Sequence, residues 1–325
     1  MEFRHALRSF FVGIDRKDCP TAPVTRIDMM RQEGPRHYLK AVPSARATGK
    51  RPLVIVLHGS GASAEQVLGL AFPFSPLSVW LEIAEREQLI VIAPDGTRQR
   101  GKRAWNDGFA GIAGNPACDD VGFIAAVIDR AIAEDGADPE RVYVIGVSKG
   151  GMMAYRLAAE LAPRLAAFSA VLAAMPQRPE YPLPSHPLSA LIVAGTADPF
   201  IPYLGGKSLI TLGFMAPALG IEATAAVWRN LAGLEGEPVV DNTGRVERCT
   251  WGSSAGSLQV ALLKIVGGGH AEPSCKKRYP GLFSRFPGHQ STEVETAEEA
   301  WAFFKDKRRC SQSHLVSDPL AETLQ

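Results

Sequence analysis

Short apolar segments, each bounded by turn-forming residues, constrain the fold of this chain more than any other feature of its sequence. They are rich in β-branched residues and run without polar alternation, which is typical of strands buried on both faces of a sheet. The segments are "PLVIVLHG" (52–59), "LIVIAPDG" (89–96), "RVYVIG" (141–146), "FSAVLAA" (168–174), "ALIVAG" (190–195) and "LQVALLKIV" (258–266). Helical patterns lie between several of them. The chain is therefore predicted to be an α/β protein with a mainly parallel sheet and helices on both faces.

Amphipathic helices are indicated where apolar residues recur every three or four positions. The clearest segments are 120–135, 149–162 and 294–304. Asp119 or Asp120 supplies an N-cap for the first of them. Thr292 with Glu295 is predicted to form a capping box ahead of the third.

No internal repeat or Ser/Pro-rich linker divides the sequence, which predicts one domain over residues 34–307. Residues 1–33 are expected to form an N-terminal extension, with an edge strand as an alternative for part of it. Residues 308–325 are a polar tail that we expect to be disordered. Two loop-rich stretches, 176–187 and 199–225, predict a cap that is small or absent.

Charge and hydropathy exclude several classes of protein. The 35 Lys and Arg residues balance 34 Asp and Glu residues to a formal net charge of +1, so no bulk attraction to nucleic acid or membrane is expected. No apolar stretch approaches the roughly 20 residues of a membrane-spanning helix. The N-terminus lacks the features of a secretory peptide, so we expect a cytoplasmic protein. A secreted or periplasmic location is the alternative if an export signal is missing from this chain.

The five cysteines are scattered, odd in number and without C-x-x-C spacing. This pattern favours free thiols over a disulfide framework or a zinc site. A bridge between Cys249 and Cys275 is the alternative. No metal site is expected.

Residues 146–151, "GVSKGG", contain the pattern Gly-x-Ser-x-Gly around Ser148. The pattern occurs again in "GSSAG" around Ser254, so structural context must decide between the two serines. Ser148 lies between a predicted strand and a predicted helix, the context of a nucleophilic serine, where a Cβ at Gly146 or Gly150 would clash. Ser254 lies where a hairpin turn is expected. Ser148 is therefore the predicted nucleophile, with an ordinary helix N-cap as the alternative.

A serine nucleophile needs a base within hydrogen-bond reach and an acid that orients the base. In an α/β-hydrolase both partners follow the serine, first the acid and then the histidine, on loops after later strands. Asp198 follows "ALIVAG" and His270 follows the last predicted strand, so we predict them as acid and base. The alternatives are an Asp-Pro turn for Asp198 and a structural role for His270. His289 is a rival base, although it precedes a helix and follows no strand.

Acyl transfer also needs backbone N–H donors that stabilise a developing oxyanion. The N–H of Lys149 follows the serine at a helix N-terminus and is one candidate. The second is expected in the loop "LHGSGAS" after an early strand, where we assign the N–H of Ser60. His58 is expected to orient this loop or contact the substrate rather than act on protons.

Seven segments occur in the order seen in one known group of enzymes. They are "LHGSG", "RAWNDG", "DDVGFI", "DPERVYVIGVSKGGMMAYRLAAE", "AGTADPFIPYLGG", "VGGGH" and "TAEEAWAFF". Over residues 35–307 the chain resembles the polyhydroxybutyrate depolymerase-like and feruloyl esterase group of α/β-hydrolases. The resemblance implies the α/β-hydrolase fold and a serine carboxylesterase without cofactor. It assigns the nucleophile, acid and base to Ser148, Asp198 and His270.

The resemblance also suggests that Trp105, Asn106 and Asp120 shape or brace the site, with the first two as substrate contacts. Core packing, turn formation and helix capping are the alternatives. Lys149 stands where an Asn is frequent; an ammonium facing the cleft would favour an anionic ester, and a solvated surface lysine is the alternative. Residues 271–274, "AEPS", stand where Thr-Trp-Pro-Gly is frequent. The missing tryptophan removes an aromatic wall and argues against polyhydroxybutyrate itself as the substrate.

Together these patterns predict a serine carboxylic-ester hydrolase that acts on small or oligomeric esters, such as hydroxyalkanoate oligomers or feruloyl and aryl esters. No cofactor, nucleic-acid partner or membrane partner is expected. An amide or poly-amino-acid hydrolase on the same fold is one alternative, because the same residues serve both reactions and only the pocket decides. A hydrolase-like binding protein without turnover is another.

Overall fold

The structure is a computed structural model of the whole chain. It describes residues 20–46, 48–99, 101–109, 115–207, 217–253, 258–279 and 288–309. Most of the N-terminal extension, Ser254 and the tail from residue 310 onward lie outside the described residues. Among the helices of the described ranges, none is long and apolar enough to cross a membrane.

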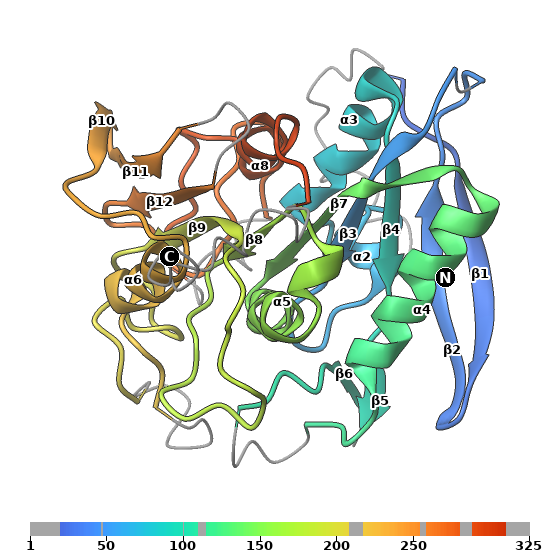
Figure 1. Cartoon of the computed structure of the whole chain (residues 1–325), viewed down its shortest axis with the longest axis horizontal. Helices are drawn as coiled ribbons and strands as arrows, with labels where there is room; N and C mark the ends of the chain where they lie inside the picture. The colour runs from blue at the N-terminus through green and yellow to red at the C-terminus, as the bar shows by residue number, and fades with distance from the viewer. Residues whose placement is uncertain are drawn as a thin grey trace, which may run out of the picture.

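A ten-stranded sheet forms the centre of the molecule, in the order β1-β2-β4-β3-β7-β8-β9-β12-β11-β10. Its six central strands are parallel, whereas hairpins of antiparallel strands, β1 with β2 and β10 with β11, form the two ends (Figure 1). The strands are β1 (Val24–Arg31), β2 (Gly34–Ala41), β3 (Arg51–Leu57), β4 (Ile90–Pro94), β7 (Ala137–Val147), β8 (Ala167–Val171), β9 (Ser189–Gly195), β10 (Val239–Thr243), β11 (Val246–Gly252) and β12 (Gln259–Ile265). A separate small sheet pairs β5 (Thr97–Gln99) with β6 (Lys102–Ala104).

The central strands form from the apolar segments found in the sequence. Every residue of β3, β4, β8 and β9 is buried. Strands without polar alternation are buried in this way because helices cover both faces of a parallel sheet. The predicted fold class is confirmed.

Helices cover both faces of this sheet. On one face lie α4, α5 and α6, and Tyr155 of α5 and Trp228 of α6 pack against Phe168 of the sheet. On the other face lie α2, α3 and α8, and Tyr143 stacks on Phe304 at 4.9 Å between ring centroids. The helices are α2 (Ala64–Val67), α3 (Trp80–Glu87), α4 (Asp120–Glu134), α5 (Lys149–Glu160), α6 (Ile221–Leu231) and α8 (Thr296–Phe304), with the 3-10 turns η1 (Pro76–Val79) and η2 (Ala162–Arg164).

Three local features were open or incorrectly assigned at the sequence level. Part of the N-terminal extension forms β1, an edge strand that pairs along its whole length with β2. Residues 221–225 were assigned to a loop-rich stretch but begin α6. Cys249 and Cys275 are separate thiols, so the alternative of a bridge between them does not apply.

The predicted capping box of Thr292 and Glu295 is wrong. The helix begins at Thr296, and the Glu295 side chain makes no cap hydrogen bond. Its carboxylate instead accepts hydrogen bonds from Ser274 Oγ–H and from the Lys276 N–H. A tertiary contact therefore replaces the local cap.

The topology brings four loops to one edge of the sheet. Parallel strands end at the same edge, and the loops that follow them can meet there. The strands β3, β7, β9 and β12 end at Leu57, Val147, Gly195 and Ile265. The residues singled out in the sequence lie directly after these four ends.

Candidate active site

Ser148 lies in a tight turn between β7 and α5. Its backbone has a φ of 54° and a ψ of −118°, which residues other than glycine rarely adopt. A Cβ on Gly146 would lie 2.1 Å from the carbonyl oxygen of Gly150, and a Cβ on Gly150 would lie 2.3 Å from that of Leu57. Only glycine fits at these two positions, so the strained turn depends on both of them.

A continuous chain of hydrogen bonds joins Ser148, His270 and Asp198. Ser148 Oγ lies 2.8 Å from His270 Nε2, and His270 Nδ1 lies 2.6 Å from Asp198 Oδ2. The other oxygen of Asp198 accepts the N–H groups of Phe200 at 2.8 Å and Ile201 at 2.9 Å. Because Asp198 is buried, water does not compete for its carboxylate. The arrangement allows the histidine to accept the serine proton.

Backbone contacts hold the loop that carries His270. A Cβ on Gly195 would lie 2.3 Å from the carbonyl oxygen of Gly268. The N–H of Gly269 donates to the carbonyl of His289 at 2.8 Å. The side chain of His289 is exposed and does not line the cavity beside the serine. The geometry therefore favours His270 over its rival.

The loop of residues 58–61 packs against the serine turn. A Cβ on Gly59 would lie only 3.6 Å from the Cβ of Ser148, so the two backbones are in close contact. Ser60 and Lys149 line the same cavity. Neither of their backbone N–H groups donates a hydrogen bond to any atom in the described part of the chain. Two unengaged donors beside one hydroxyl are what an oxyanion site requires.

His58 is fully buried and braces this loop. Its Nδ1–H donates to the Gly59 carbonyl at 2.8 Å, and its Nε2 accepts the Gly96 N–H at 3.0 Å. This pattern requires the neutral imidazole. Burial lowers the pKa of His58 and favours the same form. Since His58 also borders the cavity, it fits the expected role of orienting the loop.

Asp95 holds the segment that follows this loop, although no motif in the sequence indicated it. Its Oδ1 accepts the Ala64 N–H at 2.7 Å, and its Oδ2 lies 2.8 Å from the Arg103 guanidinium and 2.6 Å from His37 Nε2. Among described residues, His37, Glu65 and Asp95 form the one group whose potential metal-ligand atoms all lie within 4.8 Å of one another. Because Arg103 already pairs with this carboxylate, the group fits an ion-pair network better than a metal site. Its position directly after a buried strand was the available signal.

The side chain of Lys149 is buried beside the serine. Its ammonium lies 2.8 Å from Asp107 Oδ2 and donates to Asn115 Oδ1 at 2.5 Å. The interpretation as a solvated surface lysine is therefore wrong, whereas Lys149 does line the cavity, with its ammonium paired to Asp107. Breaking a buried pair by removing one partner costs about 3–5 kcal/mol, so the pair fixes the first turn of α5.

Trp105, Asn106 and Asp120 brace the site without bordering it. Trp105 is fully buried and donates from Nε1 to the His58 carbonyl at 2.9 Å. The Asn106 N–H donates to Asp120 Oδ2 at 2.7 Å, and Arg36 pairs with Asp120 Oδ1 at 2.6 Å. Neither Trp105 nor Asn106 lines the cavity, which corrects their assignment as substrate contacts.

A cavity of about 790 Å³ opens beside Ser148. One part of its boundary, which we call the nucleophile wall, consists of the loop 57–62 and the turn 146–151. A second part, the histidine wall, consists of residues 270–279 with Ser75. The rest of the lining is mostly apolar, with Val67, Pro73, Met152, Phe200 and Ile201 beside Gln66 and Lys102. A cavity of this size and character is typical of small-molecule sites.

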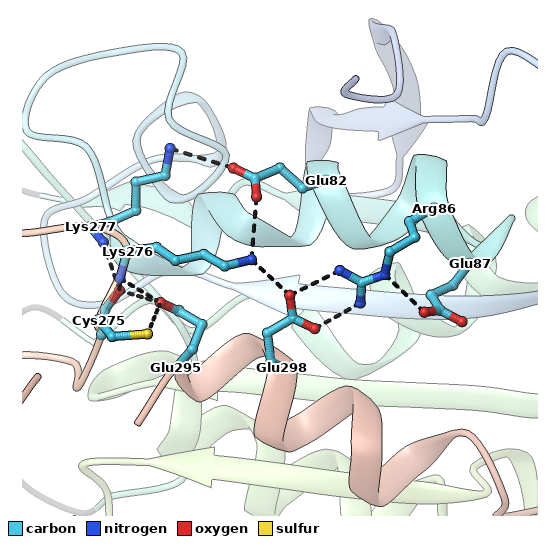
Figure 2. A network of polar contacts seen from close by, with 9 residues as sticks. Glu82, Arg86, Glu87, Cys275, Lys276, Lys277, Glu295 and Glu298 are labelled. Carbon is cyan, nitrogen blue, oxygen red and sulfur yellow. Dashed lines mark hydrogen bonds and ion pairs between the residues drawn. The ribbon is translucent and has the colours of Figure 1, made fainter. Parts of the chain in front are cut away.

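Ion pairs fix the histidine wall from outside the cavity (Figure 2). Glu295 accepts hydrogen bonds from Ser274 Oγ–H at 2.5 Å and from the Lys276 N–H at 3.1 Å. The Lys276 ammonium pairs with Glu298 of α8 at 2.8 Å and with Glu82 of α3 at 3.4 Å (Figure 2). The loop is thus tied to two helices. These partners lie on distant segments, so no local sequence signal indicated them.

Comparisons with known proteins place the chain among esterases. A protein of Nocardia uniformis subsp. tsuyamanensis that carries the name esterase NocK is 29% identical over 323 residues, covering 90% of this chain and 86% of that protein. Feruloyl esterase B of Piromyces equi is 30% identical over 241 residues, covering 67% of this chain and 42% of that protein. An acetyl xylan esterase structure from Aspergillus awamori matches with a TM-score of 0.57 at 16% identity, over 87% of this chain and 99% of that one. No family model matches the chain.

The sheet order, the helices on both faces and the matching structure show that the chain has the α/β-hydrolase fold. The chain is an esterase, and its relatives include a feruloyl esterase and a poly(3-hydroxybutyrate) depolymerase. The recognition made from the sequence motifs is confirmed. The relatives indicate the class of reaction, the hydrolysis of carboxylic esters, but they do not identify the substrate.

Proposed function

We propose that this esterase works through an acyl-enzyme formed on Ser148. As Ser148 Oγ attacks the ester carbonyl, His270 takes its proton and then gives it to the leaving alcohol. Asp198 holds the imidazole in the working tautomer and stabilises its cationic form. Water then hydrolyses the acyl-enzyme with the same base. The observation that carries the proposal is the hydrogen-bonded chain from Asp198 through His270 to Ser148, which ends at the cavity.

The backbone N–H groups of Ser60 and Lys149 are assigned to the oxyanion of the tetrahedral intermediate. Each such donor contributes about 3 kcal/mol to transition-state stabilisation. The N-terminus of α5 favours negative charge at the same place. The buried Lys149–Asp107 pair supports this arrangement because it fixes the residue that supplies one of the donors.

The substrates are proposed to be small or oligomeric esters. The cavity has an apolar lining and a volume of about 790 Å³, which accommodates an aryl or a hydroxyacyl group. Relatives named feruloyl esterase and poly(3-hydroxybutyrate) depolymerase make both groups reasonable probes.

Hydrolysis of p-nitrophenyl esters of increasing chain length, of methyl ferulate and of a 3-hydroxybutyrate oligomer tests the proposal. Ser148→Ala is expected to lower kcat by about 10⁴ to 10⁶ because it removes the nucleophile. Ser254→Ala changes the serine of the second motif and should retain wild-type activity. Wild-type rates in Ser148→Ala would refute the mechanism, and cleavage of amide analogues without cleavage of any ester would replace the substrate class.

A further inference from the structure

Glu272 brings a buried carboxylate to the histidine wall, two residues after His270. It is 4% exposed and lines the cavity. Its Oε1 accepts the Ser75 hydroxyl at 3.0 Å, and its Oε2 accepts the Tyr279 hydroxyl at 2.6 Å. Ser75 and Tyr279 line the cavity as well. The three side chains therefore form one polar patch in a lining that is otherwise largely apolar.

Further hydrogen bonds hold this patch in place. Ser75 Oγ accepts the Leu77 N–H at 3.1 Å, so its hydroxyl hydrogen is directed to Glu272. Gln290 accepts the Tyr279 N–H at 3.1 Å and donates from Nε2 to the Glu272 carbonyl at 2.8 Å. Burial, together with the neighbouring Glu272 carboxylate, raises the pKa of Tyr279, so the phenol keeps its proton and donates. The carboxylate is preorganised before a ligand arrives.

No cation of the described chain neutralises Glu272. Across the described ranges, no Lys, Arg or His nitrogen lies within 4.0 Å of either carboxylate oxygen, whereas the Lys149 ammonium and the His270 imidazole of the lining each pair with an aspartate. A carboxylate has about four lone-pair positions, and two hydroxyls use only two of them. Burying such a charge without a cation is costly. Lys102, the remaining charged residue of the lining, is exposed to solvent.

We propose that Glu272, with Ser75 and Tyr279, binds a protonated amine of the substrate, so that the enzyme prefers esters carrying an ammonium a few bonds from the ester carbonyl. This inference rests on the proposed function, because it describes the specificity of the same site. A charge-assisted hydrogen bond is roughly twice as strong as a neutral one, so an ammonium is favoured over a hydroxyl. The ammonium also supplies the positive charge that the buried carboxylate lacks.

The position of Glu272 limits the distance between the ammonium and the ester carbonyl of the substrate. Residues two positions apart have Cα atoms within about 7 Å, so the carboxylate lies near the base that serves the reacting carbonyl. The same position holds a tryptophan in the pattern that the sequence resembles. A charged side chain has thus replaced an aromatic one in the wall, which is consistent with a substrate of different polarity.

The test uses pairs of esters that are identical except that one carries a protonated amine nitrogen where the other carries a C–H group. For the alcohol side, 2-(dimethylamino)ethyl butyrate is compared with 3-methylbutyl butyrate. For the acyl side, ethyl 4-(dimethylamino)butyrate is compared with ethyl 5-methylhexanoate. For each pair we take the ratio of kcat/KM for the amine to kcat/KM for its carbon analogue. In at least one pair we expect this ratio to be about 10- to 100-fold higher in the wild type than in Glu272→Gln. Comparing the two enzymes cancels the inherent reactivity of the amino ester.

Each ratio is taken on a single preparation, so it does not depend on the fraction of folded enzyme. Asp28→Asn, at an exposed position on β1, changes the net charge by the same amount and should keep the wild-type ratio. Tyr279→Phe leaves the charge and should keep part of the preference, which provides a second variant if Glu272→Gln does not fold. Equal ratios in the wild type and Glu272→Gln would overturn this inference while leaving the proposed function intact. Failure of the wild type to cleave any ester would instead refute the proposed function.

Discussion

The two walls of the cavity are held by different kinds of contact. In the nucleophile wall, backbone meets backbone: a Cβ on Gly150 would lie 2.3 Å from the Leu57 carbonyl oxygen. In the histidine wall, side chains from distant segments meet, as Ser75 and Glu272 do across 197 positions of sequence. The first wall carries the proposed nucleophile, and the second carries the proposed base together with the groups that we propose to bind the substrate. We infer from this difference that the turn at the proposed nucleophile depends on local backbone requirements, whereas the histidine wall depends on tertiary contacts.

The largest effect is expected from Gly150→Ala in the nucleophile wall. The new methyl group would overlap the backbone of β3, so the turn must move away from the oxyanion loop. Overpacking of this kind costs about 1–3 kcal/mol of unfolding free energy, occasionally more, and we expect kcat/KM to fall by at least about 10³-fold. Gly49→Ala is the matched control, because a Cβ there meets nothing within 4 Å. Near-normal activity of Gly150→Ala would contradict the view that this wall is fixed by its backbone.

An intermediate effect is expected from Glu295→Ala behind the histidine wall. The variant leaves the buried Ser274 hydroxyl without its acceptor and removes one of the two acceptors of the Lys276 N–H, which costs about 1–3 kcal/mol of unfolding free energy. We expect KM to rise more than kcat falls, since the loop binds substrate. Urea unfolding measures the loss of stability, and steady-state kinetics measure KM and kcat. The exposed Glu235→Ala is the control. A loss confined to kcat would show that this wall serves the chemistry instead.

The free energy of unfolding is expected to depend on pH through His58 of the nucleophile wall. Burial lowers the pKa of His58 below its ordinary 6.5. Below pH 6.5 the unfolded chain therefore binds a proton that the folded protein does not, and the free energy of unfolding falls as the pH drops, by up to about 1.4 kcal/mol per pH unit. Urea unfolding at pH 7.5 and 5.5 should show a smaller fall in His58→Gln than in the wild type. If the free energy of unfolding falls equally in both proteins, His58 is not the source of the pH dependence.

The smallest effect is expected at the surface of the ion-pair network. Hydrogen bonds from Arg86, together with Lys276, lower the pKa of Glu298 to about 2. Its stabilisation is thus present above pH 4.5 and is lost as the pH falls toward 2. Because the pair is partly exposed, Glu298→Gln should cost less than about 1 kcal/mol at neutral pH, and even less in 1 M salt. A cost that is larger and independent of salt would show that the network does more than fasten the loop.

The sequence predicted the nucleophile wall well, because its requirements are local. The strands follow from continuous apolar segments, and Gly146 and Gly150 reveal the strained turn at Ser148. The order of acid and histidine after later strands then indicated Asp198 and His270. All of these signals follow from short segments and from the topology of a parallel sheet.

Features that depend on partners far along the chain could not be predicted. Lys149 was interpreted from its type alone, and its burial depends on Asp107, which lies 42 positions earlier. Glu295 was read as part of a cap, whereas its partners are Ser274 and Lys276. Glu272 was noted only through the tryptophan that it replaces. In each case the residue type is known from the sequence, but its contact partners are determined by the fold.

Covalent labelling by a fluorophosphonate, followed by peptide mass spectrometry, tests whether Ser148 is the nucleophile. The reagent reacts with a serine that a neighbouring base activates. We predict one adduct on Ser148 in the wild type and in Ser254→Ala, and none in Ser148→Ala. An adduct on Ser254, or wild-type labelling that persists in Ser148→Ala, would contradict the account.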